Sequence, residues 1–333
     1  MKARNVAVVG ATGAVGRTML DVLAGRRFPV GAVHALASKR SAGKEVDFAG
    51  RTLEVKPLEE FDFAGVDVAL FSAGAAVSLE HAPRAAAAGA VVIDNTSAYR
   101  QHPDVPLVVP EVNPHEIANR PRGIIANPNC STIQMVVALK PLHDRAVIRR
   151  IVVSTYQSVS GAGNRAMEEL RRSAAGVLAG EEPAPGPVFA HRIGFNCIPQ
   201  IDVFLDDGYT KEEHKMIFET RKIFGDPSIR VTATCVRVPV LVGHAEAINV
   251  EFERPLPPDE ARALLAAAPG VELLDAPQDR SYPMQVLCAG RDPVLVGRIR
   301  RDPSTENALD LWIAADNLRK GAALNAVQIA ELL

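Results

Sequence analysis

The sequence predicts an α/β protein of two domains. In roughly the first 130 residues, short apolar runs without polar interleaving alternate with helix patterns, which is typical of a parallel sheet covered on both faces. After Ile148 the apolar runs alternate with polar residues and few helices separate them, which favours a mostly antiparallel sheet. The length of 333 residues fits two domains better than one. We therefore expect a Rossmann-type domain followed by an α+β domain.

The elements of the first domain alternate in sequence between strands and helices. The strands are expected at residues 5–9, 32–37, 66–71 and 91–93, and the helices at residues 15–24 and 78–88. In the second domain, strands are expected at residues 151–156, 231–238, 247–253 and 294–300. The segment 179–187 (AGEEPAPGP) is expected to be an exposed loop, and residues 317–333 show a helix pattern.

Composition excludes several classes of function. The formal charge is -2 without a basic block, so a nucleic-acid or anionic-membrane partner is not expected. The N-terminus lacks a signal-peptide pattern and no apolar stretch could span a bilayer, which favours a cytoplasmic protein. The four cysteines form no CxxC pair, so neither a disulfide framework nor a metal site is expected. We interpret Cys197, Cys235 and Cys288 as small buried hydrophobic residues.

A glycine-rich turn joins the first strand to the first helix. Gly10, Gly13 and Gly16 have G-x-x-G-x-x-G spacing, and the free N–H groups of a helix start suit a pyrophosphate. An ordinary tight turn would also use glycine, but the strand–turn–helix context favours a dinucleotide. The predicted contacts of this turn are Gly10, Thr12, Gly13, Ala14, Val15 and Gly16.

The end of the second strand indicates which dinucleotide is bound. NAD sites place a carboxylate there, whereas this chain has Ser38, Lys39, Arg40 and Ser41. A guanidinium with two hydroxyls favours the 2′-phosphate of NADP. The alternative is a solvated basic turn. We predict NADP as the cofactor, with Ser38, Arg40 and Ser41 as contacts.

Cys130 has the sequence setting of a nucleophile. It follows the turn Asn127-Pro128-Asn129 at the start of a predicted helix, where the dipole and N–H groups favour thiolate. A buried cysteine flanking a helix is the alternative, but the neighbouring residues are polar. The N–H groups of the helix start, together with the Asn129 side chain, are expected beside an oxyanion.

Several motifs occur in one order along nearly the whole chain. They are GATGAVG, SKRSAGK, NPNCST, YQSVSG at residues 156–161 and RVPVLVGH at residues 237–244. Each is unspecific, but together they resemble the aspartate-semialdehyde dehydrogenase family. The resemblance implies NADPH-dependent, reversible reductive dephosphorylation of L-aspartyl 4-phosphate to L-aspartate 4-semialdehyde through a cysteine thioester. It also implies a place in the biosynthesis of lysine and diaminopimelate, threonine and methionine.

The resemblance assigns roles to residues one by one. It implies that Cys130 is the nucleophile, His244 the acid/base and Gln157 the residue that orients the substrate. The substrate contacts that it implies are Arg100 and Lys215 for phosphate, Arg237 for the α-carboxylate and Glu212 for the amino group, with Glu213 as the alternative. Ser160, Gly161 and Asn317 resemble cofactor contacts.

The domain boundaries and partners follow from the same resemblance. We expect residues 1–128 with 314–333 to bind NADP, and residues 129–313 to form the catalytic and dimerisation domain. A homodimer is implied, and a tetramer stays open. N-acetylglutamyl-phosphate reductase should have Gly in place of Asn129, and glyceraldehyde-3-phosphate dehydrogenase should lack NPNC. A nucleotide-binding regulatory protein would not need Cys130, Gln157, Arg237 and His244 together.

Overall fold

The computed structural model describes residues 3–333, which form two compact units. Unit 1 comprises the described residues up to Asn129 together with Gly321–Leu333, and unit 2 comprises Cys130–Lys320. Residues 314–320, which we expected with the cofactor domain, lie in unit 2, where the strand β14 (Ala308–Ala315) belongs to the sheet and Asn317 binds Gly243 and Ser160.

Unit 1 has a parallel sheet whose strand order is that of a Rossmann fold. The order is β5-β2-β1-β6-β7-β8, and neighbouring strands in it pair in parallel. The strands are β1 (Arg4–Val9), β2 (Val30–Ala37), β5 (Lys56–Pro57), β6 (Val68–Phe71), β7 (Val91–Asp94) and β8 (Ile124–Ala126). The order reverses between β1 and β6, which is where Rossmann domains bind dinucleotides.

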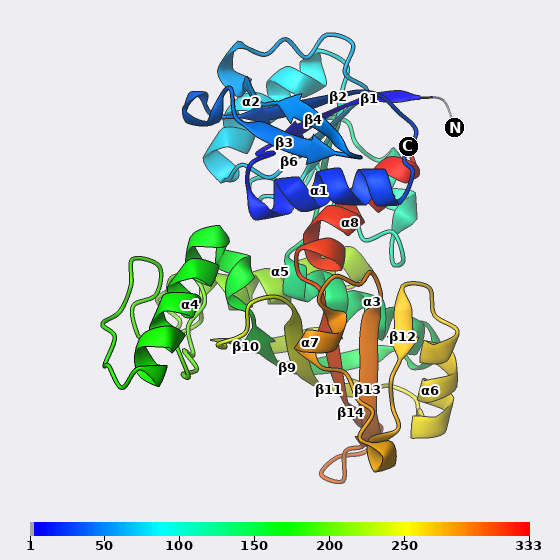
Figure 1. The fold of residues 1–333 in the computed structure, drawn as a ribbon. Helices are drawn as coiled ribbons and strands as arrows, with labels where there is room; N and C mark the ends of the chain where they lie inside the picture. The colour runs from blue at the N-terminus through cyan, green and yellow to red at the C-terminus, as the bar shows by residue number, and fades with distance from the viewer. Residues whose placement is uncertain (1–2) are drawn as a thin grey trace. The chain divides into compact units, whose positions relative to one another are not determined.

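Helices cover this sheet and one comes from the end of the chain. The helices are α1 (Ala14–Gly25), α2 (Ala75–Ala87) and α8 (Leu324–Glu331), with 3-10 turns at Lys39–Ser41, Leu58–Glu60 and Pro114–Ala118. Figure 1 shows α8 beside α1, and the two helices share a buried core with β1 and β6. Arg26 and Glu331 join their ends through two hydrogen bonds of 2.7 Å. A hairpin of β3 (Glu45–Phe48) and β4 (Arg51–Glu54) adds to unit 1.

Unit 2 contains a mixed sheet of order β10-β9-β11-β14-β13-β12. Its other strands are β9 (Ile148–Gln157), β10 (Arg230–Arg237), β11 (His244–Phe252), β12 (Val271–Leu273) and β13 (Val294–Arg301). The pairs β9–β11, β11–β14 and β13–β14 are antiparallel, whereas β9–β10 and β12–β13 are parallel. The prediction of a mostly antiparallel sheet did not include the parallel pairs, which arise because helical segments separate their strands in sequence.

One face of this sheet is covered and the other is half-exposed. The helices are α3 (Cys130–Ala146), α4 (Asn164–Leu178), α5 (Lys211–Phe224), α6 (Pro258–Ala266) and α7 (Gln285–Cys288), with 3-10 turns at Val159–Ala162 and Pro277–Asp279. α3, α5 and α6 pack on the covered face. Along β9, Ile151, Val153 and Thr155 are buried while Tyr156 is exposed, as expected for a strand with one covered face.

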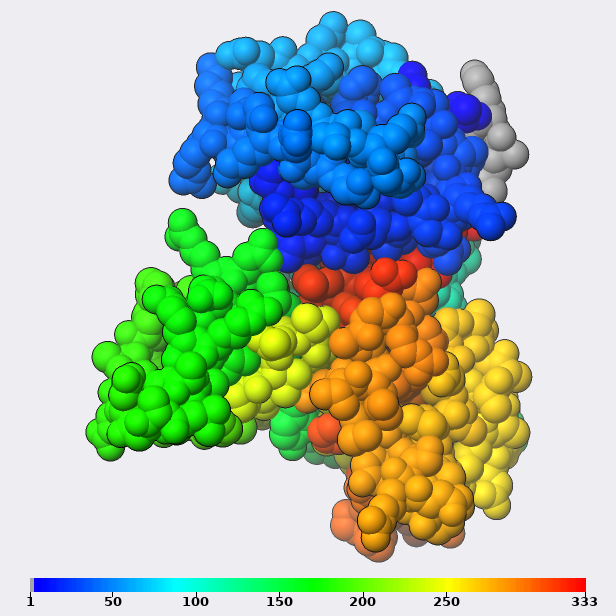
Figure 2. Space-filling view, viewed as in Figure 1, coloured from blue at the N-terminus to red at the C-terminus, as the bar shows by residue number. Residues whose placement is uncertain are grey.

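Some local predictions differ from the structure. The strands β3, β4, β5, β12 and β14 were not predicted, and most are short, whereas β8 is the apolar strand expected before the Asn127-Pro128-Asn129 turn. The C-terminal helix begins with a π-helical turn at Arg319–Ala323, after β14 has ended. Cys197 is exposed, so its interpretation as a buried residue was wrong, whereas Cys235 and Cys288 are buried. Residues 179–187 form an irregular and largely exposed segment after α4, which is green at the surface in Figure 2.

No helix among residues 3–333 is both long and apolar enough to cross a membrane.

Candidate active site

The glycine turn of unit 1 has the geometry of a pyrophosphate site. Gly10 has φ +90°, and a Cβ there would lie 3.0 Å from the Ser72 carbonyl carbon, at the point where strand order reverses. A Cβ on Gly16 would lie 2.1 Å from the Gly10 oxygen, so glycine permits α1 to pack against the turn. Gly13 is exposed and its Cβ would meet only the Gly10 oxygen, at 3.3 Å. The first turn of α1 therefore has room for an anion.

The residues predicted to select the cofactor follow β2 directly. Ser38 and Arg40 are exposed, and Ser41 is half-buried in the 3-10 turn. The Gly10 and Ala11 N–H groups both donate to the Leu36 oxygen, which ties this end of β2 to the glycine turn. The guanidinium of Arg40 is thus carried at the same sheet edge as the pyrophosphate turn.

Cys130 is the first residue of α3 and is half-buried. The position at a helix N-terminus agrees with the sequence prediction and favours the thiolate. In unit 2 the thiol lies close enough to the Arg237 guanidinium to interact with it electrostatically. A cationic neighbour stabilises a thiolate further.

Three predicted site residues come together at one end of the unit 2 sheet. Arg237 ends β10 and pairs in register with Gln157, which ends β9. His244 begins β11, and Ala245 pairs with Tyr156, so His244 lies next to Gln157 across the sheet. All three side chains are buried. The antiparallel pairing of β9 and β11 is what brings residues 157 and 244 together.

His244 is held as a neutral ring. Its Nδ1 accepts the Ser158 backbone N–H at 3.0 Å, which assigns the ring proton to Nε2. Nε2 is buried and has no hydrogen-bond partner among the described residues, and a Cβ on Gly161 would lie 3.3 Å from it. Burial and the nearby Arg237 lower the pKa of His244 to about 3. At neutral pH the ring therefore presents an N–H donor beside Gly161.

Arg237 is fixed by the same backbone segment. Its Nη1 donates to the Ser158 carbonyl at 2.7 Å, and only 6% of the residue is exposed. Burial lowers the pKa of Arg237, while Glu212 and Cys130 act in the opposite direction. Arginine nonetheless stays charged in proteins, so a fixed cation lies beside the thiol.

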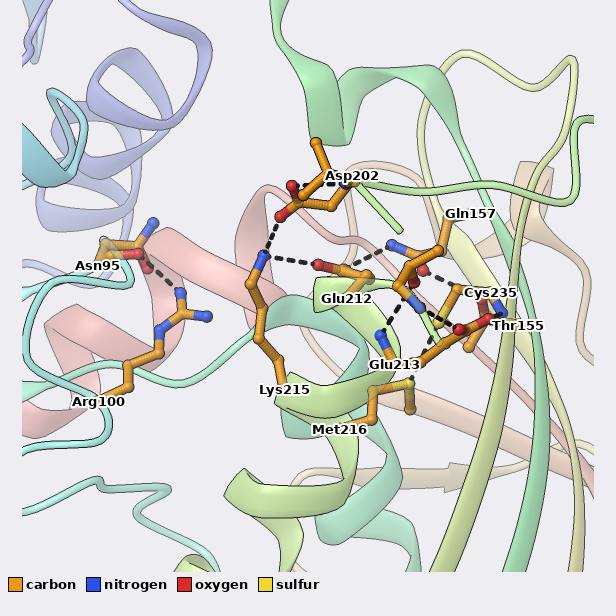
Figure 3. A network of polar contacts seen from close by, with 12 residues as sticks. Asn95, Arg100, Thr155, Gln157, Asp202, Glu212, Glu213, Lys215, Met216 and Cys235 are labelled. Atoms are coloured by element: carbon orange, nitrogen blue, oxygen red, sulfur yellow. Dashed lines mark hydrogen bonds and ion pairs between the residues drawn. The ribbon is translucent and has the colours of Figure 1, made fainter. Parts of the chain in front are cut away.

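A chain of polar contacts runs from β9 to the loop before α5 (Figure 3). Gln157 Nε2 donates to Glu212 Oε1 at 3.1 Å, and Lys215 Nζ donates to Glu212 Oε2 at 3.0 Å. Lys215 also donates to Asp202 Oδ2 at 2.9 Å. Burial of Lys215 opposes its charge, but Glu212 and Asp202 outweigh it and raise its pKa. Lys215 is thus a cation held between two carboxylates.

Glu213 has a different task from its neighbour. It closes a capping box with Thr210, whose N–H donates to Glu213 Oε2 at 2.6 Å while its hydroxyl accepts the Glu213 N–H. Oε1 of Glu213 accepts the Cys235 N–H at 2.9 Å. Both carboxylate oxygens therefore bind backbone groups, which favours Glu212 as the substrate contact.

In unit 1, Arg100 is buried against the segment that leads to the nucleophile. Its Nε donates to the Asn127 carbonyl at 3.0 Å and its Nη2 to the Asn95 carbonyl at 2.9 Å. The Asn127 side chain accepts from Asn325 of α8 at 2.7 Å. Asn129 is also buried. The C-terminal helix thereby supports the Asn-Pro-Asn turn.

Two of the predicted cofactor contacts belong to a buried network of unit 2. Asn317 Oδ1 accepts the Gly243 N–H at 2.9 Å, and its Nδ2 donates to the Ser160 hydroxyl at 2.9 Å. The Ser158 hydroxyl lies 3.1 Å from both Asn317 Oδ1 and His244 Nδ1. In the structure these side chains support the loop that carries His244. Gly161 is exposed beside them.

Comparison with known proteins identifies the family. Family models described as "Semialdehyde dehydrogenase, NAD binding domain" and "Semialdehyde dehydrogenase, dimerisation domain" match residues 5–120 and 139–320. The chain is 57% identical over 330 residues to the aspartate-semialdehyde dehydrogenase of Aquifex aeolicus, covering 98% of this chain and 97% of that protein. The chain belongs to the aspartate-semialdehyde dehydrogenase family. Like its relatives it is an oxidoreductase of the aspartate pathway with an NAD(P)-binding domain.

Solved structures of aspartate-semialdehyde dehydrogenases share the fold. The crystal structure of aspartate semialdehyde dehydrogenase II from Vibrio cholerae, complexed with ASA, matches with a TM-score of 0.97 and 56% identity, covering 100% of this chain and 98% of that chain. The enzyme from Candida albicans, crystallised with NADP, matches with a TM-score of 0.78 and 28% identity, covering 100% and 98%. Both matches extend over the two units.

Sequence reasoning missed the supporting residues of the site. Ser158 orients His244 and lies within the YQSVSG motif, which assigned it no role, while Asp202 pairs with Lys215 from a position without a distinctive sequence pattern. The sequence does contain the signal for the capping box, because Thr210 and Glu213 have its T-x-x-E spacing.

No group of three or more metal-binding side chains occurs among residues 3–333.

The different tasks of Glu212 and Glu213 predict different mutant phenotypes. Glu213→Gln should lower the free energy of unfolding by about 1–3 kcal/mol, because a buried N–H loses its acceptor. Glu212→Gln should change stability by less than about 1 kcal/mol but raise KM for the amino-acid substrate. Urea denaturation and steady-state kinetics measure both effects. The reverse pattern would exchange the two assignments.

The low pKa of His244 predicts a pH dependence of stability. Between about pH 6.5 and 3 the unfolded chain takes up a proton that buried His244 does not, so stability falls as pH falls through this window. His244→Asn should reduce the loss of unfolding free energy between pH 7 and pH 5. Exposed His191, changed to Asn, is the control. Equal pH slopes for wild type and His244→Asn would show that the ring is not held neutral.

Proposed function

We propose that the protein catalyses the reversible, NADPH-dependent reductive dephosphorylation of L-aspartyl 4-phosphate to L-aspartate 4-semialdehyde through a thioester on Cys130. The observation that carries this proposal is the placement of Cys130 and His244 next to the buried Arg237 in unit 2. The relatives described above are named aspartate-semialdehyde dehydrogenases, and the structure of one of them was determined with ASA. The product would supply lysine and diaminopimelate, threonine and methionine synthesis.

The chemistry begins at the thiolate. Cys130 attacks the acyl phosphate, forming the C–S bond and releasing phosphate, for which Arg100 and Lys215 supply positive charge. Arg237 binds the α-carboxylate through its planar guanidinium, and Glu212 receives the amino group. The N–H groups at the start of α3, with Asn129, stabilise the oxyanion. Gln157, fixed between Thr155 and Glu212, orients the acyl group.

Bound NADPH supplies a hydride to the thioester carbon. The Nε2–H of His244 is available to donate a hydrogen bond to the oxyanion formed at that carbon, which collapses to the aldehyde as the C–S bond breaks and Cys130 leaves as thiolate. The neutral state of the ring suits this role, because a donor rather than a charge is needed at the oxygen.

We propose NADP as the cofactor, bound mainly by unit 1. The glycine turn accommodates a pyrophosphate, and the basic turn after β2 replaces the carboxylate that NAD sites use. The predicted contacts at Ser160, Gly161 and Asn317 remain part of this proposal. The Candida albicans relative was crystallised with NADP.

A coupled assay tests reaction and nucleophile together. Aspartate semialdehyde, phosphate and NADP should give NADPH absorbance, and omission of phosphate should abolish it. Cys130→Ala should lower kcat by more than about a thousandfold while NADPH binding, followed by its fluorescence, stays intact. Activity on N-acetylglutamate semialdehyde in place of this substrate would overturn the substrate assignment but keep the thioester.

The cofactor arm of the same assay compares NADP with NAD. Arg40→Ala should raise KM for NADP by about 10- to 100-fold, the value of a charge-assisted hydrogen bond, and leave KM for NAD unchanged. Arg51→Ala, another arginine of unit 1 whose guanidinium lies over Phe48, is the control. Equal loss with NAD and NADP would refute recognition of the 2′-phosphate.

We further propose that the half-exposed face of the unit 2 sheet forms a homodimer. The Tyr156 and Trp312 rings lie 5.1 Å apart on this face, beside a hollow of about 350 Å³ that Ala247, Met284 and Leu311 help to line. On α7, Val286 is 75% exposed. Exposed apolar surface of this kind is typical of an interface.

Sedimentation equilibrium tests the dimer. The wild type should have about twice the chain mass of 35.6 kDa. Val286→Asp should weaken association by at least about tenfold, because it places a charge in an apolar contact, whereas Leu79→Asp on α2 should not. A monomeric wild type at micromolar concentration would reject the proposal, and twice the dimer mass would indicate a tetramer.

A further inference from the structure

A buried amide–carboxyl pair joins α3 to β11. Gln134 Nε2 donates to Glu246 Oε1 at 2.8 Å, and neither residue has any exposed surface. Nothing in the proposed reaction uses these side chains. A buried carboxyl group without a catalytic task requires another explanation.

Gln134 and Glu246 follow the proposed reacting residues, Cys130 and His244, on the same two elements. Gln134 follows Cys130 by four residues on α3, a rise of about 6 Å along one helix face. Glu246 follows His244 by two residues on the same face of β11, a rise of about 7 Å. Cys130 and His244 both lie near Arg237, so the N-terminal ends of α3 and β11 are together. The Gln134–Glu246 contact therefore joins α3 to β11 about one helical turn away from Cys130 and His244.

Among residues 3–333, no cation pairs with the Glu246 carboxyl group, whose only polar contact is with Gln134. Across the sheet its row contains Cys235, Thr155 and Ile313, of which only Cys235 can titrate. Burial raises the pKa of Cys235, and Glu212 and Glu213 of α5 raise it further. Burial likewise raises the pKa of Glu246 well above its usual value. Glu246 Oε2 and Gln134 Oε1 have no hydrogen-bond partner among residues 3–333.

We propose that Glu246 is a positioning residue that acts as a neutral carboxylic acid, and that its hydrogen bond with Gln134 sets the separation between Cys130 and His244. An ionised carboxylate in this place would be a buried charge without a partner, which costs several kcal/mol. The neutral acid carries no charge and keeps the hydrogen bond that Gln134 donates to its Oε1. The catalytic consequence rests on the proposed thioester reaction.

Conservative variants separate charge from position. Glu246→Gln preserves a neutral hydrogen-bonding group of the same length, so kcat should stay within about threefold of wild type. Glu246→Asp withdraws the carboxyl group from Gln134, so kcat should fall by at least about tenfold with little change in KM, because small misplacements of reacting groups slow the chemical step strongly. Glu251→Gln, on the other face of β11, is the matched control.

Thiol reactivity tests the positioning without any substrate. The rate of Cys130 alkylation by iodoacetamide should have the same pH profile in wild type and Glu246→Gln, and a shifted profile in Glu246→Asp. Cys130→Ala supplies the background from exposed Cys197. This readout remains valid if the proposed substrate is wrong, so the two failures are distinguishable.

Stability against pH tests the neutral acid. Above about pH 4.5 the unfolded chain loses a proton that folded Glu246 keeps, so this residue makes stability fall as pH rises. The urea midpoint of Glu246→Gln should therefore decrease less between pH 5 and pH 8 than that of wild type. Three outcomes would each overturn the proposal. Glu246→Gln could lose as much kcat as Glu246→Asp, or it could keep the wild-type dependence of the urea midpoint on pH. Glu246→Asp could also keep the kcat and the alkylation profile of wild type.

Discussion

The register of β9, β10 and β11 is the constraint on which the candidate site depends. It places Arg237, Gln157 and His244 in one row at the end of the covered face, and Cys235, Thr155 and Glu246 in the row beneath. A shift of one residue would turn a whole row to the other face. Apolar residues of the covered face oppose such a shift, so core packing also fixes the geometry of the polar groups.

Backbone groups do much of the orienting in this site. The Ser158 N–H sets the tautomer of His244, and the carbonyl of the same residue holds Arg237. One residue after β9 thus aligns a proton donor and a cation. Because these two contacts are made by main-chain atoms, they depend on the loop conformation, and the Ser158 hydroxyl adds a contact of 3.1 Å to His244 Nδ1. The Asn317 network supports the facing Gly243 segment.

Periodicity and motifs predicted the fold class, the glycine turn and the position of Cys130 at a helix start. These features are local, so a single sequence contains them. The two parallel strand pairs in unit 2 and the exposed position of Cys197 depend on tertiary packing, which local pattern does not record. Asp202 and Ser158 escaped prediction for the same reason, since their partners are distant in sequence. The different contacts of Glu212 and Glu213 are likewise tertiary and have no local sequence signal.

Two adjacent glutamates on α5 have different roles, since Glu213 holds the helix in place and Glu212 faces the candidate site. Glu213 attaches the helix start to Thr210 and to β10, while Glu212, turned about 100° around the helix axis, meets Gln157 and Lys215. Position 212 can therefore be varied without loosening the helix that carries it. With Glu212 as the proposed contact of the substrate amino group, a library at this position would explore substrates with a different group there, whereas the same diversity at position 213 would chiefly yield poorly folded chains.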